Sequence, residues 1–384
     1  MKRIPEFDAL RGLAAAIIVV YHLRFLKVVP AMGTAVDLFF VLSGYLITGI
    51  LLRDLGAPGA LRRFYIRRAL RIWPIYYLAL AVLLVLNHVS VRPHPIDAWP
   101  QFLTYTPFVQ AYWGGAMPTF PPAFVHTWSL AVEEQFYTLW PLLVVAFGRR
   151  VVATIPPLLV LGVVLRFRGI PGGLLLTHLD GLLLGSWLAI ALQPRGDDQA
   201  PRPSVRWGAG VAIGALVFWA IGKGAVALAP SGDLARIVAA LGPMRIALGY
   251  AGIVAWVIAL QGRPVLAVLR DHRLIELGKI SYGFYLYHPI VFAAITNAWI
   301  ASGWKGSIPN ASLWLDALRL GLSLGAAWAS WRWIEAPIGR WKDRLTSRRP
   351  DPAPRRPHLL IPPARASKDP LERSIDASER DQLA

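Results

Sequence analysis

The sequence predicts an all-α integral membrane protein, a bundle of about ten transmembrane helices with both termini in the cytoplasm. The 384 residues are 55% hydrophobic and only 16% charged, and the mean hydropathy is +0.48, far from the values of a soluble domain. Apolar runs recur along nearly the whole chain, so the bundle itself is the working part. The connections alternate between arginine-rich and arginine-poor, and an even number of spans satisfies that asymmetry.

Each expected span is an apolar run that ends at a charge or a helix breaker. The runs are residues 8–27, 34–52, 72–88, 128–147, 150–166, 172–193, 207–228, 234–260, 274–298 and 312–334. Because no small-residue cleavage site follows the basic start MKRIPEFDAL, the first run is predicted to be a retained span and not a signal peptide. The protein is therefore expected to be a multi-pass protein of the cell inner (cytoplasmic) membrane.

Two further segments stand out from the spans. Residues 346–384 combine many Pro, Arg and Asp with few aromatic residues, which predicts a disordered cytoplasmic tail behind a transmembrane domain at 1–345. The longest outside connection, residues 89–127, is rich in aromatic side chains. We expect it to lie on the membrane surface or to fold back over the bundle.

Charge and cysteine content exclude several functions. The net charge of +18 would indicate nucleic-acid binding in a soluble protein, but here the basic residues lie in short loops and in the tail, where the positive-inside rule expects them. Membrane lipid is an expected partner. No nucleic-acid partner is therefore expected. The chain has no cysteine, which excludes disulfides, thiolate metal sites and a cysteine nucleophile, and no metal is expected.

The first span carries two ionisable side chains, Arg11 and His22. Eleven positions are three helical turns plus roughly 20°, so the two side chains share a face, about 16 Å apart along the axis. Arg11 lies near the cytoplasmic boundary and His22 deeper, towards the outer half. Burying such groups costs several kcal/mol unless partners satisfy them, which favours a functional role. The alternative is a snorkelling arginine and a hydrogen-bonded structural histidine.

The second span adds Asp37 at its outer end and Ser43 and Gly44 in its middle. Asp37 is placed to pair with His22, although a helix N-cap explains it equally well. Small residues in a membrane helix allow close approach of a neighbouring helix. We therefore favour a packing role for Ser43 and Gly44.

Before the third span, FYIRRALRIWPIYY places Arg68 and Arg71 three positions apart, on one helix face at the cytoplasmic boundary. Arginines at this depth satisfy the positive-inside rule and bind anionic lipid head groups. Their planar guanidinium groups are equally suited to bidentate binding of the phosphates of a nucleotide-like donor. The residues alone leave both interpretations open.

The segment HTWSLAVEEQFYTLWPLL places Glu133, Glu134 and Tyr137 in the outer part of a span. Paired carboxylates are expensive in a membrane. One of them is expected to orient His22 as a general base, and a structural salt bridge with an arginine is the alternative.

In the ninth span, GKISYGFYLYHPIV contains Ser281, Tyr285 and His288. Pro289 leaves local carbonyl groups unbonded, and the two hydroxyls are expected to satisfy them. We favour a structural role for this set, with pocket lining by His288 as the minor alternative.

These segments together resemble the membrane-bound acyltransferase-3 family. The resemblance is carried, in order from about residue 3 to 342, by EFDALRGLAAAIIVVYHL, DLFFVLSGYLIT, FYIRRALRIWPIYY, HTWSLAVEEQFY, THLDGLLLGSWLA, SYGFYLYHPIV and WRWIEAPIGRW. It implies an integral membrane O-acetyltransferase that moves an acyl group, most often acetyl, from cytosolic acetyl-CoA (acyl-CoA) to a hydroxyl of a cell-envelope or secreted glycan. The form expected here is the stand-alone one without an appended esterase-like domain, with enzymes of glycan synthesis as further partners.

The resemblance also assigns roles to residues. The family's motif of a basic residue, ten residues and a histidine maps onto Arg11 and His22, and its Arg-x-x-Arg pair maps onto Arg68 and Arg71, which favours donor binding for that pair. With Arg11 they would hold the phosphates of coenzyme A, whose extended arm would bring the acyl group to His22. His22 is then the general base or, alternatively, an acyl-carrying nucleophile, and Glu134 orients it. The expected lining of the pocket is Asp37, Ser43, Trp128, Glu133, Tyr137, Asp180, Tyr285 and His288.

A multi-pass solute or proton-coupled transporter is the alternative function. Transporters use intramembrane Arg, His and Glu in relays. The sequence shows no visible internal repeat of the kind that many transporter folds carry, which favours the enzyme.

Overall fold

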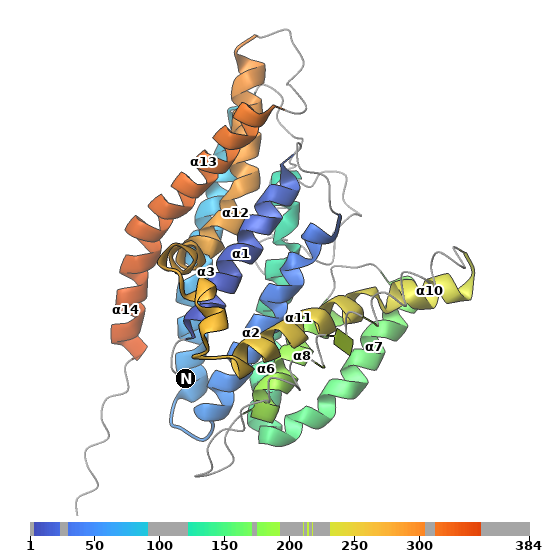
Figure 1. The fold of residues 1–384 in the computed structure, drawn as a ribbon. Coiled ribbons are helices and arrows are strands. Elements are labelled where there is room, and N and C mark those ends of the chain that lie inside the picture. The colour runs from blue at the N-terminus through green and yellow to red at the C-terminus, as the bar shows by residue number, and fades with distance from the viewer. Residues whose placement is uncertain are drawn as a thin grey trace, which may run out of the picture. The chain divides into compact units, whose positions relative to one another are not determined.

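The computed structural model describes residues 4–23, 30–90, 122–170, 175–192, 231–303 and 312–346, with residues 210, 213, 214 and 217 between them. Every regular element in this part of the chain is a helix (Figure 1), which confirms the predicted all-α class there. Most of the predicted span at 207–228, most of the outer connection at 89–127 and all but the first residue of the predicted tail at 346–384 lie outside the described residues.

The α-helices keep the labels of Figure 1. They are α1 (Pro5–His22), α2 (Ala35–Arg53), α3 (Ala60–His88), α6 (Trp128–Phe147), α7 (Ile155–Phe167), α8 (Asp180–Leu192), α10 (Asp233–Ala240), α11 (Gly242–Ala259), α12 (His272–Ala301), α13 (Leu313–Ser330) and α14 (Ala336–Thr346). Short 3₁₀ turns join several of them: η1 (Pro30–Thr34), η2 (Pro122–Thr127), η3 (Gly148–Thr154), η4 (Leu175–Thr177), η5 (Pro264–Leu266) and η6 (Val268–Arg270). One π-helical turn, η7 (Trp331–Glu335), links α13 to α14.

Five helical stretches in the described part are long and apolar enough to cross a membrane, as expected of a membrane protein. They are Met32–Arg53, Ala60–His88, Ala123–Phe167, Asp233–Ala259 and His272–Ala301. The third of them, 45 residues long, covers two predicted spans, because α6, η3 and α7 follow one another without a break. The total of about ten crossings and the position of the termini stay predictions.

Glycines decide which helices meet most closely. An added Cβ on Gly278 of α12 would collide with the backbone carbonyl group of Asp8 in α1, and one on Gly12 would lie 2.7 Å from the backbone nitrogen of Gly278. Since neither glycine has a side chain, α1 and α12 pack directly against each other at this point. This contact brings the far end of α1, with His22, alongside His288 of α12.

A second close contact joins α2 to α8. A Cβ on Gly44 would collide with the carbonyl group of Leu182, and one on Gly185 would collide with that of Val41. The packing role expected for Gly44 is therefore confirmed. The neighbouring Ser43 has a different environment, described below.

Replacing Gly44 by alanine is expected to lower the free energy of unfolding by about 1–3 kcal/mol, because the methyl group has no room against α8. Gly325 of α13 is the matched control, since an added Cβ there meets no atom within 4 Å. In a helix interior Gly→Ala alone is worth up to about 1 kcal/mol of added stability, so Gly325→Ala should shift the unfolding free energy in the opposite direction. Denaturation of the purified variants in detergent measures both, and a shift of the same sign would contradict the packing argument.

Candidate functional site: an arginine cavity and a histidine pair

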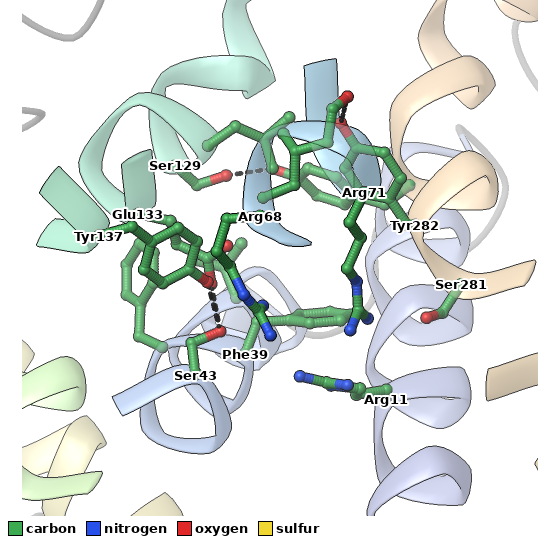
Figure 2. A pocket seen from close by; sticks show the side chains of 15 residues that line it. Arg11, Phe39, Ser43, Arg68, Arg71, Ser129, Glu133, Tyr137, Ser281 and Tyr282 are labelled. Carbon is green, nitrogen blue, oxygen red and sulfur yellow. Dashed lines mark hydrogen bonds between the residues drawn. The ribbon is translucent and has the colours of Figure 1, made fainter. Parts of the chain in front are cut away.

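The cavity described here is formed where α1, α2, α3, α6 and α12 meet. Fifteen residues line it (Figure 2), and the empty space between them, open solvent included, is about 660 Å³. Its apolar lining comes mainly from α2. Its polar lining consists of Arg11, Ser43, Arg68, Arg71, Ser129, Glu133, Tyr137, Ser281, Tyr282 and Tyr285.

The arginines come from two helices and meet at this cavity. Figure 2 shows the guanidinium groups of Arg11, Arg68 and Arg71 pointing towards the same space. The i, i+3 spacing on α3 places Arg68 and Arg71 on one face, and Arg11 enters from α1. Among the described residues, none of the three lies within 4.0 Å of a carboxylate oxygen in an ion pair. Three guanidinium groups without an ion-pair partner form a site for an anion with several acceptor oxygens.

The positive field of this cluster reaches α14. Partial burial and, next, the positive charge of Arg71 lower the pKa of Lys342 from its ordinary value. Asp343 acts in the opposite direction as the neighbouring negative charge. The cluster therefore acts on side chains outside the cavity, as a fixed group of cations would.

The opposite wall of the cavity is a short hydrogen-bond chain. The buried Tyr137 hydroxyl donates to Ser43 Oγ at 3.0 Å, and Ser43 Oγ donates to Glu133 Oε1 at 2.7 Å. Arg68 lies over the Tyr137 ring, with its guanidinium carbon 5.7 Å from the ring centre. Ser43, expected to serve helix packing, thus orients a carboxylate beside the arginines.

Glu134 faces away from this wall. Its Oε2 accepts a hydrogen bond from Trp73 Nε1 of α3 at 3.1 Å, because adjacent positions on a helix point about 100° apart. The structure brings no described carboxylate to His22, so neither the predicted Glu134–His22 pair nor an Asp37–His22 pair is present there. Glu134 instead ties α6 to the helix that carries Arg68 and Arg71.

The partner of His22 is another histidine. His22 Nδ1 lies 2.8 Å from the carbonyl oxygen of Ile18 and 3.3 Å from Nε2 of the buried His288. The ring of His126, at the end of η2, is centred 5.3 Å from that of His288. Among the described residues no group of three or more His, Cys, Asp or Glu is arranged to hold a metal ion.

His126 was missed at the level of sequence. It opens the segment HTWSLAVEEQFY, and the argument applied to His22, an ionisable group at the edge of an apolar run, applies to it as well. Its ring nitrogens are buried and have no hydrogen-bond partner in the described part of the chain. Ser129, one turn further on, was missed because a single serine in a membrane helix carries no chemical signal.

Tyr285 contacts both the arginine cavity and the histidines. It lines the cavity, while its ring is centred 5.1 Å from that of His126 and 6.1 Å from that of His288. Its hydroxyl donates to the His126 carbonyl at 2.8 Å and shares a hydrogen bond of 2.7 Å with Ser129. His22 and His288 do not line the cavity, whereas Tyr285 lines it and also contacts the ring of His288.

Two of the residues expected to line the pocket hold the helices together elsewhere. Asp180, at the start of α8, forms a buried ion pair with Arg166 of α7 at 2.7 Å, and its second oxygen lies 3.1 Å from the same guanidinium group. The Trp128 ring packs on Phe40 and, with centres 4.7 Å apart, on His178. Neither lines the cavity, and the same is true of Asp37 in the first turn of α2.

Replacing Asp180 by alanine is expected to lower the free energy of unfolding by about 3–5 kcal/mol, because it leaves the charge of Arg166 buried and unbalanced. Asp233 is the matched control: it pairs with Arg236 at 3.6 Å, but both side chains are exposed, and removal of an exposed partner costs about 1 kcal/mol or less. Unfolding of the two detergent-solubilised variants in parallel measures the loss of unfolding free energy in each. Equal losses would mean that the Asp180–Arg166 pair is no more than a surface contact.

Comparison with known proteins places these residues in a family. The family described as an acyltransferase domain, acyltransferase-3, matches residues 4–332. The peptidoglycan O-acetyltransferase OatA of Listeria monocytogenes serovar 1/2a is 36% identical over 162 residues, 38% of this chain and 25% of its own length. A Staphylococcus aureus (strain COL) protein, provisionally named an O-acetyltransferase, is 27% identical over 392 positions, 92% of this chain and 60% of its own.

A third relative, from Bacillus subtilis (strain 168), is provisionally named a peptidoglycan O-acetyltransferase and is 35% identical over 158 residues, 37% of this chain and 24% of its own length. The chain thus spans 60% or less of the length of these relatives. No solved structure gives a significant match. The family match covers every residue of the arginine cavity and of the histidine pair, and the chain therefore belongs to the acyltransferase-3 family.

Proposed function

We propose that this protein is a membrane-embedded O-acyltransferase that moves an acyl group, most readily acetyl, from cytosolic acyl-CoA to a hydroxyl of a cell-envelope glycan. The observation that carries the proposal is the convergence of Arg11, Arg68 and Arg71 on one cavity without an ion-pair partner in the described residues. Three phosphate-binding groups next to a histidine pair are what a donor with phosphates at one end and a thioester at the other requires.

The donor enters this scheme from the arginine side. Its phosphates bind the three guanidinium groups, and its pantetheine arm runs along α1 towards His22. Along the helix axis Arg11 and His22 are about 16 Å apart, which is of the order of that arm. The acyl carbon must then pass the ring of Tyr285 to reach His22, so we infer that this ring moves when the donor binds.

His22 is the residue for the chemical step. As a general base it takes the proton of the acceptor hydroxyl, the hydroxyl oxygen bonds to the acyl carbon, the carbon–sulfur bond breaks, and the proton passes to the leaving thiolate of coenzyme A. As a nucleophile, the alternative, His22 would carry the acyl group between donor and acceptor. Glu134 acts in either scheme at a distance, by holding α3 and its arginines against α6 through Trp73.

The membrane arrangement follows from the same scheme. About ten crossings with both termini in the cytoplasm of a bacterial inner membrane place Arg11, Arg68 and Arg71 at the cytosolic side, where acyl-CoA is available. His22 at the other end of α1 then lies towards the outer half, where an envelope glycan is available. The exposure of His22, in contrast to the buried His288, fits a group that meets an incoming acceptor.

The acceptor is proposed by chemical class. Two of the relatives carry names that specify peptidoglycan, so a sugar hydroxyl of peptidoglycan or of a related envelope glycan is the first acceptor to test. Mass spectrometry of envelope glycans from cells with and without the gene identifies both the acyl group and the sugar that bears it.

Transfer itself is tested in inside-out membrane vesicles that contain the protein and receive acetyl-CoA labelled in the acetyl group. The expected result is label bound covalently to glycan, and no label on glycan when the vesicles contain His22→Ala. A solute that accumulates in the vesicles without covalent transfer would contradict the proposal and favour the transporter.

A further inference from the structure

Pro289 lies inside α12. A proline has no N–H group, so the carbonyl four residues earlier, that of Tyr285, receives no hydrogen bond from the helix. The sequence led us to expect hydroxyl groups at such carbonyls, but Ser281 donates to the Gly278 carbonyl and Tyr285 to that of His126. The side chain that reaches the Tyr285 carbonyl is His288, whose Nδ1 lies 2.7 Å from the oxygen.

This contact fixes the protons on His288. A carbonyl oxygen only accepts hydrogen bonds, so His288 Nδ1 carries the hydrogen. In the neutral imidazole the other nitrogen, Nε2, is then an acceptor. The ring is completely buried, and its environment offers no competing carboxylate among the described residues that contact it. These are Tyr285, Phe292, His22 and His126.

The protons of His22 are fixed in the same way. Its Nδ1 faces two acceptors, His288 Nε2 at 3.3 Å and the Ile18 carbonyl oxygen at 2.8 Å. Nδ1 therefore carries the hydrogen, and Nε2 of the neutral ring keeps its lone pair. Because Pro289 has no N–H, the Tyr285 carbonyl accepts from His288 Nδ1, and this sets the tautomer of His288. His288 Nε2 in turn favours the tautomer of His22 in which Nε2 is unprotonated.

We propose that His288 is a positioning residue that, together with Pro289, sets the tautomer of His22 so that Nε2 is the proton-accepting nitrogen. The part of this proposal that concerns catalysis rests on the proposed function. When His22 Nε2 takes the proton of the acceptor hydroxyl, the ring becomes an imidazolium whose Nδ1–H donates to His288 Nε2, a hydrogen bond that is stronger when the donor is charged. In a catalytic triad a carboxylate holds the tautomer of the histidine base and stabilises its charged form. Here the neutral, buried His288 has that role towards His22.

The protons are read directly by ¹⁵N NMR of the full-length protein in nanodiscs, labelled at histidine, with the His22 signals assigned by their loss in His22→Gln. The expected wild-type spectrum has His22 Nδ1 protonated and Nε2 unprotonated. In His288→Leu, where only the Ile18 carbonyl remains, and in Pro289→Ala, where the new N–H competes for the Tyr285 carbonyl, the His22 signals should shift towards the Nε2–H form. A protonated His22 Nε2 in neutral wild-type protein, or signals unchanged in both variants, would overturn the proposal.

Kinetics separates positioning from simple packing. His288→Leu is expected to lower kcat about tenfold or more, with the KM for acetyl-CoA unchanged, because His288 does not line the arginine cavity. His288→Gln places an amide oxygen near the position of Nε2 and should restore most of kcat. His272→Leu, at an exposed position on the same helix, is the control and should leave both parameters unchanged. A KM effect equal to the kcat effect, or no rescue by glutamine, would contradict positioning.

The NMR measurement tests the tautomer of His22, and the transfer assay tests the proposed function, so one can fail without the other. If the wild-type nitrogens carry the expected protons but no acyl transfer takes place, the proposed function is wrong and the assignment of the His22 tautomer is supported. If transfer takes place with a protonated His22 Nε2, the proposed function holds and the role of His288 is wrong.

Discussion

His22→Ala is expected to lower acyl transfer to the envelope glycan by about 10²- to 10⁴-fold, the range over which a positioned general base contributes. The variant should still reach the membrane at normal abundance, because His22 is exposed at the end of α1 and is absent from the packed core. It should also bind acetyl-CoA with unchanged affinity, since His22 does not line the arginine cavity. Binding by calorimetry and transfer by covalent label on glycan measure the two properties on the same preparation.

His272→Ala is the control for His22→Ala, because it removes an exposed imidazole at the start of α12. It should retain both binding and transfer. Normal glycan acylation in His22→Ala would contradict a chemical role for this residue, whether as base or as acyl carrier. A loss of donor binding that matches the loss of transfer would place His22 in the donor site and contradict its position outside the arginine cavity.

The fold class could be predicted because it depends on composition and periodicity. Apolar runs of the right length gave the helices of the described part, and the boundaries differ where local chemistry decides them. The run at 172–193 is an example: its α-helix begins only at Asp180, which Arg166 holds in a buried ion pair. The hydropathy of a segment cannot show that Asp180 pairs with Arg166 on another helix.

The arginine cavity was accessible to sequence reasoning for a related reason. The i, i+3 spacing of Arg68 and Arg71 fixes a shared face whatever the tertiary structure. Their meeting with Arg11 depends on how α1 and α3 are placed within the bundle, which the resemblance to the family supplied and the helix patterns did not.

The histidine pair was not accessible in this way. His22 and His288 meet because α1 and α12, more than 250 positions apart in sequence, approach closely at Gly12 and Gly278. A carboxylate was the expected partner of His22, since electrostatic reasoning from sequence pairs opposite charges. The structure uses a proline and a neutral imidazole instead, and neither gives an electrostatic signal.

The position of Tyr285 beside both clusters has a consequence for donor binding. If the proposed donor binds in the arginine cavity, the ring of Tyr285, which lines the cavity and contacts His126 and His288, is expected to meet it. The ring is held through its hydroxyl by Ser129 and by the His126 carbonyl. We therefore expect a donor in the cavity to act on the histidines through this one side chain.

Arg68→Ala is expected to weaken acetyl-CoA binding about 10- to 100-fold, because each hydrogen bond from a guanidinium to a phosphate is charge-assisted and worth about 1.5–3 kcal/mol. Arg68→Lys keeps the charge but loses the planar fork, and should fall between wild type and alanine. Arg62→Ala is the matched control on the same helix, at an exposed position that does not line the cavity. Calorimetric titration of the purified variants with acetyl-CoA measures all three.

The salt dependence of the same titration distinguishes phosphate binding from a structural role. If Arg68 contacts phosphate, raising the ionic strength should weaken binding in the wild type and in Arg62→Ala more than in Arg68→Ala, which has one charge fewer to screen. Arg71, on the same face and more exposed, should show the same behaviour with a smaller loss, since an exposed charge is already partly screened. Unchanged affinity in both Arg68→Ala and Arg71→Ala would reduce the pair to determinants of membrane topology, the alternative that their predicted place at the cytoplasmic boundary leaves open.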